Sequence, residues 1–276
     1  MRLVTFHSQG RSAPGRLEGD EVVDLSQDGR FADLRELVAA MPPARIATLE
    51  GSRRTLSSVR LLAPVPRPPK FVAVGLNYRD HALEQNKQPP DFPMFFAKAR
   101  NSVVGQGDRI ELPRGRMEID VEVELGVVFA LPGGSLTAEN ALEHVLGFTI
   151  VNDVSDRQAQ REDKQFYRAK SFRTFGPMGP VVVTPDEFDH RDAPLRLWRN
   201  GQLQQESRTS ELIFSVEKLI ELLSFAQDLE PGDVLATGTP GGVGVFRKPP
   251  VFLQDGDVIE CEIEGIGRLR NPVVRA

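Results

Sequence analysis

The stretch EIDVEVELGVVFA (residues 118–130) alternates charged and apolar residues and then becomes wholly apolar. Side chains alternate between the two faces of a strand, so Asp120, Glu122 and Glu124 share one face. After Leu125 the run is continuously apolar, which is typical of a strand buried on both faces. We therefore expect the three acids at the mouth of a core, where positive charge must balance them.

A second apolar run ends in another acid. The segment Phe148 to Val151 is followed by Asn152 and Asp153, and an acid at the end of a buried strand is either a turn residue or a site residue. If Asp153 faces Glu122 and Glu124, three carboxylates converge. Such an all-oxygen set suits Mg²⁺ or Mn²⁺, and also Ca²⁺, rather than zinc. Spacing alone leaves open a solvated strand face that pairs with lysines or arginines.

Composition narrows the class of protein. The chain has 276 residues, of which 40% are hydrophobic and 26% charged, as in soluble globular proteins. A net charge of −5 argues against nucleic acid as the main partner. The single Cys261 excludes an internal disulfide. There is no apolar signal-peptide segment at the N-terminus and no run of ~18 apolar residues, so we expect a cytoplasmic protein without a membrane partner.

The chain is predicted to have an α+β fold that is mainly β, with two domains. Four prolines in residues 61–70 form a stiff segment that cannot continue a helix. This predicts a small N-terminal α+β domain over 1–63 and a larger domain over 64–276. Strands and helices are predicted from short β-branched runs at 2–6, 15–25, 70–76, 121–130, 145–153, 179–185, 195–202, 233–239 and 257–265, and from helical spacing at 31–41, 78–86, 137–146 and 215–225. The helices are too few for a doubly wound parallel sheet.

The predicted helix over 78–86 carries two candidate groups. Asn77 can cap its N-terminus, with Asp80 near the third position. His81 and Glu84 are three residues apart and share a helix face. A carboxylate beside an imidazole can fix its tautomer, as a general base requires, but a surface pair on an amphipathic helix has the same spacing.

Two further segments offer polar groups. Lys170 lies between aromatic and small residues, where it can stabilise an oxyanion or extend along the surface. The glycine-rich loop TGTPGGVG contains Thr239 and can contact an anion through its amides, or simply connect two elements. It has neither the P-loop pattern nor a G-x-G-x-x-G segment that opens a helix.

Nine segments, in this order, resemble the fumarylacetoacetate hydrolase family, in its bacterial branch of acylpyruvases and 2-hydroxyhepta-2,4-diene-1,7-dioate isomerases. The resemblance covers residues 70 to about 272. The matching segments are VGLNYRDHALE, PMFFAKARNSVVG, DVEVELGVVF, VLGFTIVNDVSDR, AKSFRTFGPMGP, RNGQLQQ, LIFSV, LEPGDVLATGTPGGVG and GDVIECEIEGIG.

The resemblance implies a divalent-metal site and a catalytic pair. Glu122, Glu124 and Asp153 match the family's metal ligands, and the cofactor is expected to be Mg²⁺ or Mn²⁺, with Ca²⁺ as an alternative. His81 and Glu84 match the pair that activates water. The implied fold is a mixed β-roll with few helices, in a homodimer.

The resemblance also implies substrate contacts. Lys170 matches the lysine that stabilises the substrate oxyanion, and Thr239 matches the threonine near the ligand. The chain departs from the family pattern around the pocket at Asp156, Gln158, Ala169 and Arg173, so these departures bear on the substrate rather than the chemistry. Arg173 would suit an anionic substrate if it faces the pocket.

Together these features predict a metal-dependent hydrolase that cleaves a C–C bond in a β-diketo acid such as an acylpyruvate. An isomerase of 2-hydroxymuconate-type dienoates or an oxaloacetate decarboxylase could use the same metal site. A metal- or ligand-binding module without catalysis is the alternative from a different class.

Overall fold

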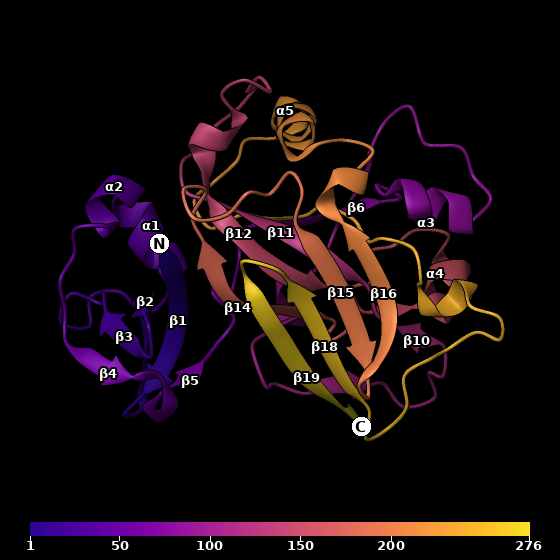
Figure 1. Ribbon diagram of the computed structural model, residues 1–276, viewed down its shortest axis with the longest axis horizontal. Helices are drawn as coiled ribbons and strands as arrows, with labels where there is room; N and C mark the ends of the chain where they lie inside the picture. The colour runs from indigo at the N-terminus through magenta and orange to yellow at the C-terminus, as the bar shows by residue number, and fades with distance from the viewer.

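A computed structural model describes residues 1–276 as three β-sheets with few short helices (Figure 1). The largest sheet has twelve strands, and its long path runs β4-β3-β2-β1-β14-β12-β11-β17-β6-β7, with β5 paired to β1 and β8 to β14. In chain order its strands are β1 (Arg2–Ser8), β2 (Arg11–Glu18), β3 (Glu21–Asp24), β4 (Arg53–Thr55), β5 (Arg60–Leu61), β6 (Phe71–Gly75), β7 (Met94–Ala97), β8 (Val103–Val104), β11 (Val123–Phe129), β12 (Val145–Asn152), β14 (Gly176–Val183) and β17 (Val234–Ala236).

Two smaller sheets complete the β structure. The five-stranded sheet, in the order β16-β15-β18-β19-β9, lies in front of β11 and β12 in Figure 1. Its strands are β9 (Ile110–Leu112), β15 (Pro194–Arg199), β16 (Gln202–Arg208), β18 (Val258–Ile263) and β19 (Gly267–Arg275). A two-stranded sheet pairs β10 (Ile119–Asp120) with β13 (Ser155–Asp156).

The helices lie around the sheets and are short. The α-helices are α1 (Leu34–Ala40), α2 (Pro43–Ile46), α3 (Arg79–Glu84), α4 (Arg157–Asp163) and α5 (Val216–Ala226). Single 3₁₀ turns are η1 (Leu56–Ser58), η2 (Arg100–Ser102), η3 (Ala141–His144), η4 (Thr209–Glu211) and η5 (Gly244–Phe246). None is long and apolar enough to cross a membrane.

Two apolar cores explain the unbroken apolar run in β11. Leu125, Val127 and Phe129 belong to a cluster of 41 buried residues that also includes residues of β15 and β18. Val128 points the other way, into a cluster of 21 buried residues that includes residues of α1. Each buried aliphatic side chain contributes about 1.5–3 kcal/mol, and this stability offsets the cost of burying charge at the start of the same strand.

The predicted class, α+β and mainly β, is confirmed. Of the sixteen strand pairings only β8–β14, β9–β19 and β6–β17 are parallel, so no doubly wound sheet exists. The helix predicted over 137–146 is only the 3₁₀ turn η3. Because β1 pairs with both β2 and β14, the N-terminal strands extend the large sheet. The domain boundary at residue 63 stays a prediction.

The predicted cap of α3 is wrong. Tyr78 occupies the N-cap position, and no side chain caps the helix. Asn77 is fully buried; its amide nitrogen donates to the carbonyl oxygens of Phe214 (3.1 Å) and Thr237 (2.8 Å), and its oxygen accepts from the Phe214 amide (2.8 Å). Because these tertiary hydrogen bonds occupy the Asn77 side chain, it does not cap α3 as the local sequence predicts.

Candidate active site

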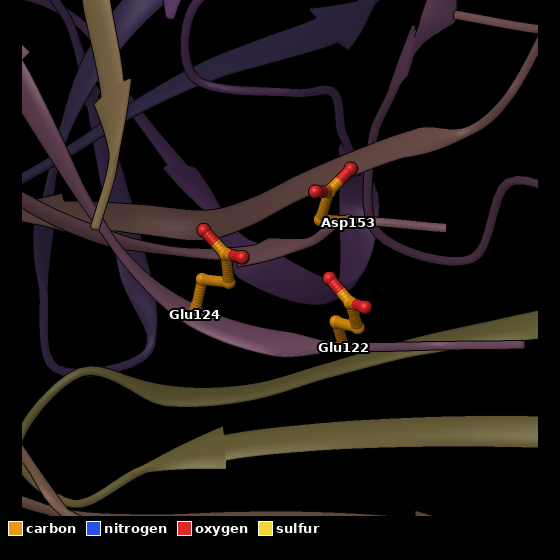
Figure 2. A group of neighbouring side chains, drawn as sticks. All are labelled: Glu122, Glu124 and Asp153. Carbon is orange, nitrogen blue, oxygen red and sulfur yellow. The ribbon is translucent and has the colours of Figure 1, made fainter. Parts of the chain in front are cut away.

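Three carboxylates converge where β11 and β12 meet. The two strands are antiparallel, with Val123 opposite Asn152, and the Asp153 amide donates to the Glu122 carbonyl (2.8 Å). This register brings Asp153 beside Glu122 and Glu124, and Figure 2 shows the three side chains grouped together. One oxygen of each lies within 4.8 Å of the others, and all three residues are buried. The convergence that the sequence left open is therefore present.

Two lysines bind this cluster. Lys170 Nζ donates to Glu122 Oε2 (2.7 Å) and Asp153 Oδ2 (2.5 Å). Lys98 Nζ donates to Asp153 Oδ1 and to the carbonyl oxygens of Lys170 (2.5 Å) and Phe175 (3.0 Å), so all three of its protons are used. The Lys98 side chain is 0% exposed, and burial lowers its pKa although Asp153 opposes the shift.

An arginine lies between Asp120 and Glu122. Arg157 Nε donates to Asp120 Oδ1 (2.8 Å), and its Nη2 donates to Glu122 Oε1. Arg157 is the first residue of α4, whose N-cap Asp156 accepts from the Ala159 amide (3.0 Å). Asp120 is therefore balanced by a guanidinium and does not join the three converging carboxylates.

The carboxyl groups differ in their pKa values because their neighbours differ. Burial raises the pKa of Glu124 well above its ordinary value, and the charges of Asp153 and Glu122 raise it further. Burial also acts to raise the pKa of Glu122, but Lys170 and Arg157 outweigh it, so this pKa is lowered. Glu124 has only the Gly238 amide as a hydrogen-bond donor (2.9 Å). It is the carboxylate that most needs additional positive charge.

The cluster has a net negative charge, and its ligand atoms are of the kind that a divalent cation binds. With every group ionised, four acids face three bases, which leaves a net charge of −1: Asp120, Glu122, Glu124 and Asp153 against Lys98, Arg157 and Lys170. Carboxylate oxygens without cysteine or histidine suit Mg²⁺, Mn²⁺ or Ca²⁺. A divalent ion at Glu122, Glu124 and Asp153 would change the net charge from −1 to +1. The residues present fit such a group because three buried carboxylates each offer an oxygen within 4.8 Å of the others.

His81 and Glu84 line a cavity that Glu122 and Glu124 also line. His81 Nδ1 lies 3.0 Å from Glu84 Oε2, and His81 Nε2 lies 2.8 Å from the Gln85 side-chain nitrogen. Both contacts fit one tautomer, with the proton on Nδ1 and a lone pair on Nε2. The Gly242 amide donates to Glu84 Oε1 (2.9 Å), so the TGTPGGVG loop fixes the carboxylate that orients the imidazole.

Thr239 is held firmly at the cavity wall. Its hydroxyl donates to the Val123 carbonyl (3.0 Å) and accepts from the Gln205 side-chain nitrogen (2.9 Å). One lone pair of the hydroxyl remains for another contact. Gln205 also accepts from the Val123 amide (2.9 Å), so this threonine is part of a network that fixes the start of β11.

Six of the predicted site residues line one cavity of about 910 Å³. Its lining includes His81, Glu84, Glu122, Glu124, Lys170 and Thr239, while Asp153 lies beneath them and is fully buried. Arg173 is exposed and is absent from the lining. The structure therefore does not bring this arginine to the site, because its side chain points to solvent.

Two buried bases at the site are absent from the sequence prediction. Lys98 has no distinctive signal in PMFFAKARN, because only the fold reveals that it lies beneath Asp153. Arg157 has a local signal: Asp156 is a favoured N-cap residue, and RQAQRED after it contains good helix formers. A helix predicted at that point places Arg157 in its first turn, shortly after the predicted strand over 145–153.

Comparison with known proteins identifies relatives along the whole chain. Residues 70–274 match the family model described as fumarylacetoacetate (FAA) hydrolase, C-terminal. The mitochondrial oxaloacetate tautomerase fahd2 of Xenopus laevis is 40% identical over 289 aligned positions, which cover 99% of this chain and 90% of that protein. The resemblance found in the nine sequence segments is thereby confirmed.

Solved structures agree with this assignment. The fumarylacetoacetate hydrolase of Exiguobacterium antarcticum is 39% identical with a TM-score of 0.88, and all of both chains is covered. The 5-carboxymethyl-2-hydroxymuconate delta-isomerase of Mycobacterium smegmatis is 38% identical with a TM-score of 0.84, covering 100% of this chain and 99% of that one. The same fold therefore serves proteins named for different reactions.

The opposite pKa shifts of Glu124 and Glu122 predict opposite effects of removing each charge. Because the pKa of Glu124 is raised in the folded state, its stability contribution is present at low pH and is lost as the pH rises. In chelator-treated protein at pH 8, Glu124→Gln is expected to raise the melting temperature by about 2–4 °C for each kcal/mol regained. The gain should shrink toward pH 5, as differential scanning calorimetry would show.

Glu122→Gln is the matched control and is expected to lower the melting temperature at pH 8, because it takes a paired carboxylate from Lys170 and Arg157. If both glutamine variants lower the melting temperature equally at that pH, the assignment of excess negative charge to Glu124 is wrong.

Proposed function

We propose that this chain, which belongs to the fumarylacetoacetate hydrolase family of enzymes, catalyses the metal-dependent keto–enol isomerisation of a 2-oxo acid of the oxaloacetate type. The observation that carries the proposal is the oriented pair of His81 and Glu84 in the cavity lined by the carboxylates Glu122 and Glu124. Isomerisation needs a group that moves a proton and positive charge that stabilises the enolate, and the site combines both. The tautomerase name of the Xenopus laevis relative supports this choice.

The metal site in this proposal consists of Glu122, Glu124 and Asp153. A bound Mg²⁺ or Mn²⁺ supplies a Lewis acid that orients the 2-oxo acid and makes its neighbouring C–H group more acidic. The ammonium of Lys170, already within 2.7 Å of Glu122, adds positive charge next to the substrate oxygen. Thr239 offers its remaining lone pair to a donor on the substrate.

His81 is the proposed proton carrier. Glu84 keeps the proton on Nδ1, so Nε2 can take a proton from the carbon next to the ketone and pass it to the ketone oxygen, which gives the enol; in the reverse direction Nε2 takes the proton from the enol oxygen and returns it to the carbon. In the structure the Gln85 side chain occupies Nε2 at 2.8 Å. Substrate must displace this amide before His81 can act.

C–C bond hydrolysis, the leading prediction from the sequence, is the second candidate. The cavity of about 910 Å³ is large for a four-carbon acid and has room for a longer acyl chain together with a water molecule. The same imidazole, held by Glu84, can take a proton from that water instead of from carbon. The two reactions therefore share every proposed residue and differ in the substrate. The cytoplasmic location and the homodimer remain predictions.

Loss of the imidazole should abolish most turnover. With Mn²⁺ and oxaloacetate, His81→Ala is expected to lower kcat for enol-to-keto conversion by about 10²- to 10⁴-fold, because general acid–base catalysis supplies that range. The conversion is followed by ultraviolet absorbance of the enol. His7→Ala, which changes a histidine on β1 outside the cavity, should retain the wild-type rate.

The same preparation is tested with an acylpyruvate. If pyruvate is released from the acylpyruvate and the rate of enol-to-keto conversion of oxaloacetate is unchanged, C–C bond hydrolysis is the reaction and isomerisation is excluded. A His81→Ala enzyme that isomerises at the full rate would remove His81 from the mechanism.

The metal site is tested separately by calorimetry. Mn²⁺ is expected to bind at one ion per chain, and Asp153→Asn should weaken binding by about tenfold or more, because affinity for hard cations follows the charge of the oxygen ligands. Asp163→Asn is the matched control, since Asp163 lies at the end of α4 and pairs with Arg168. Equal Mn²⁺ affinity in all three proteins would exclude Asp153 as a ligand.

A further inference from the structure

The cavity is lined by six basic residues, and half of them have an acidic partner. Arg157 and Lys170 bind the carboxylate cluster, and Arg161 pairs with Glu118 at 2.6 Å. The other three have no carboxylate within ion-pair distance: Lys87, Arg247 and Lys248. Lys87 donates to the Gln85 side chain at 2.7 Å, and Lys248 is exposed. Arg247 is half-buried, so its unpaired charge is the most shielded from water of the three.

Arg247 is fixed by backbone carbonyl groups. Its Nε donates to the Gly242 carbonyl (3.0 Å), and its Nη2 donates to the Gln204 carbonyl. A guanidinium has five N–H donors, so three remain, two on Nη1 and one on Nη2. Adjacent donors of this kind bind a carboxylate through two parallel hydrogen bonds. The side chain is therefore oriented by the protein while its carboxylate-binding edge is left free.

The loop that carries Arg247 is anchored to β10. The Val245 amide donates to Asp120 Oδ2 (2.8 Å), and the Val251 amide donates to the Gly244 carbonyl (2.9 Å). The Phe246 ring lies 5.6 Å from the His81 ring, edge to face. These contacts place Arg247 in the wall next to the proposed proton carrier, at a fixed position relative to the carboxylates.

We propose that Arg247 is the specificity-determining residue that binds the second carboxylate of the substrate, the one remote from the acidic cluster. This inference rests on the proposed function, and it narrows the substrate class to 2-oxo dicarboxylates. A monocarboxylate would leave the oriented guanidinium without an anion. Lys248, the next residue and also in the lining, adds positive charge on the same side of the cavity.

The test measures binding without turnover. Malate has a 2-hydroxy acid end and a remote carboxylate, whereas oxalate lacks a remote group. With the Mn²⁺-loaded protein, Arg247→Gln is expected to raise the Kd of malate about 10- to 100-fold, the usual effect of losing hydrogen bonds between charged groups, and to leave the Kd of oxalate unchanged. Arg247→Lys, which keeps the charge but loses the paired donors, should fall between. Isothermal titration calorimetry gives all of these values.

Arg270→Gln is the control for net charge, because Arg270 is exposed on β19 and is absent from the cavity lining; it should bind malate as the wild type does. Equal weakening of malate and oxalate in Arg247→Gln would mean that Arg247 only supports the loop, and unchanged malate binding would also overturn the proposal.

Catalysis distinguishes this inference from the function on which it rests. If oxaloacetate is not isomerised but malate binding depends on Arg247, the proposed reaction fails and the carboxylate subsite stands. If oxaloacetate is isomerised and Arg247→Gln leaves its KM unchanged, the reaction stands and the subsite fails. The expected result is a raised KM for oxaloacetate with little change in kcat, because a contact remote from the reacting carbon contributes to substrate and transition state alike.

Discussion

The pairing of Val123 with Asn152 fixes the site on which the rest of the cavity depends. Glu122 immediately precedes β11 and Asp153 immediately follows β12, so the register of the two strands brings these two acids side by side. A slip of one residue would turn Glu122 and Glu124 to the opposite face of the sheet. The apolar residues that follow Val123 in β11 and precede Asn152 in β12 make such a slip costly, because they fill cores on both faces of the large sheet. Hydrophobic burial thus enforces the position of the charged groups.

Burying so much charge requires internal compensation, and the compensation is uneven. Glu122 and Asp153 accept hydrogen bonds from basic side chains, whereas Glu124 accepts one only from a backbone amide. A cluster with one unmatched acid is less stable without a cation than a fully paired one would be. The same deficit makes the cluster a good ligand for a divalent ion, so some stability of the metal-free protein is exchanged for binding capacity.

The sequence predicts the parts of this site that depend on local periodicity. Alternation in residues 120–124 places the acids on one face, and helical spacing places His81 and Glu84 together. The convergence of Asp153 with them depends on strand register, which a single sequence does not reveal, although the family resemblance indicates it. The structure differs from the prediction at Asn77 and Arg173. Asn77 suits a helix cap by residue type, but its side chain makes tertiary hydrogen bonds instead. Arg173 suits an anion contact by residue type, but its side chain is exposed to solvent. The role of Lys98 could not be predicted because it depends on tertiary contacts with Asp153 and with two backbone carbonyl groups.

Gly242 contacts both the carboxylate that orients His81 and the arginine proposed to bind the substrate. Its amide donates to Glu84, its carbonyl accepts from Arg247, and its φ of +96° favours glycine. A Cβ there would lie 2.3 Å from the Gln204 carbonyl oxygen, so no other residue fits without moving the chain. Gly242 therefore contributes to the orientation of both the imidazole, through Glu84, and the guanidinium. A movement of the Gly242 backbone would disturb both contacts at once, so the positions of the proposed proton carrier and of the proposed carboxylate-binding residue are coupled.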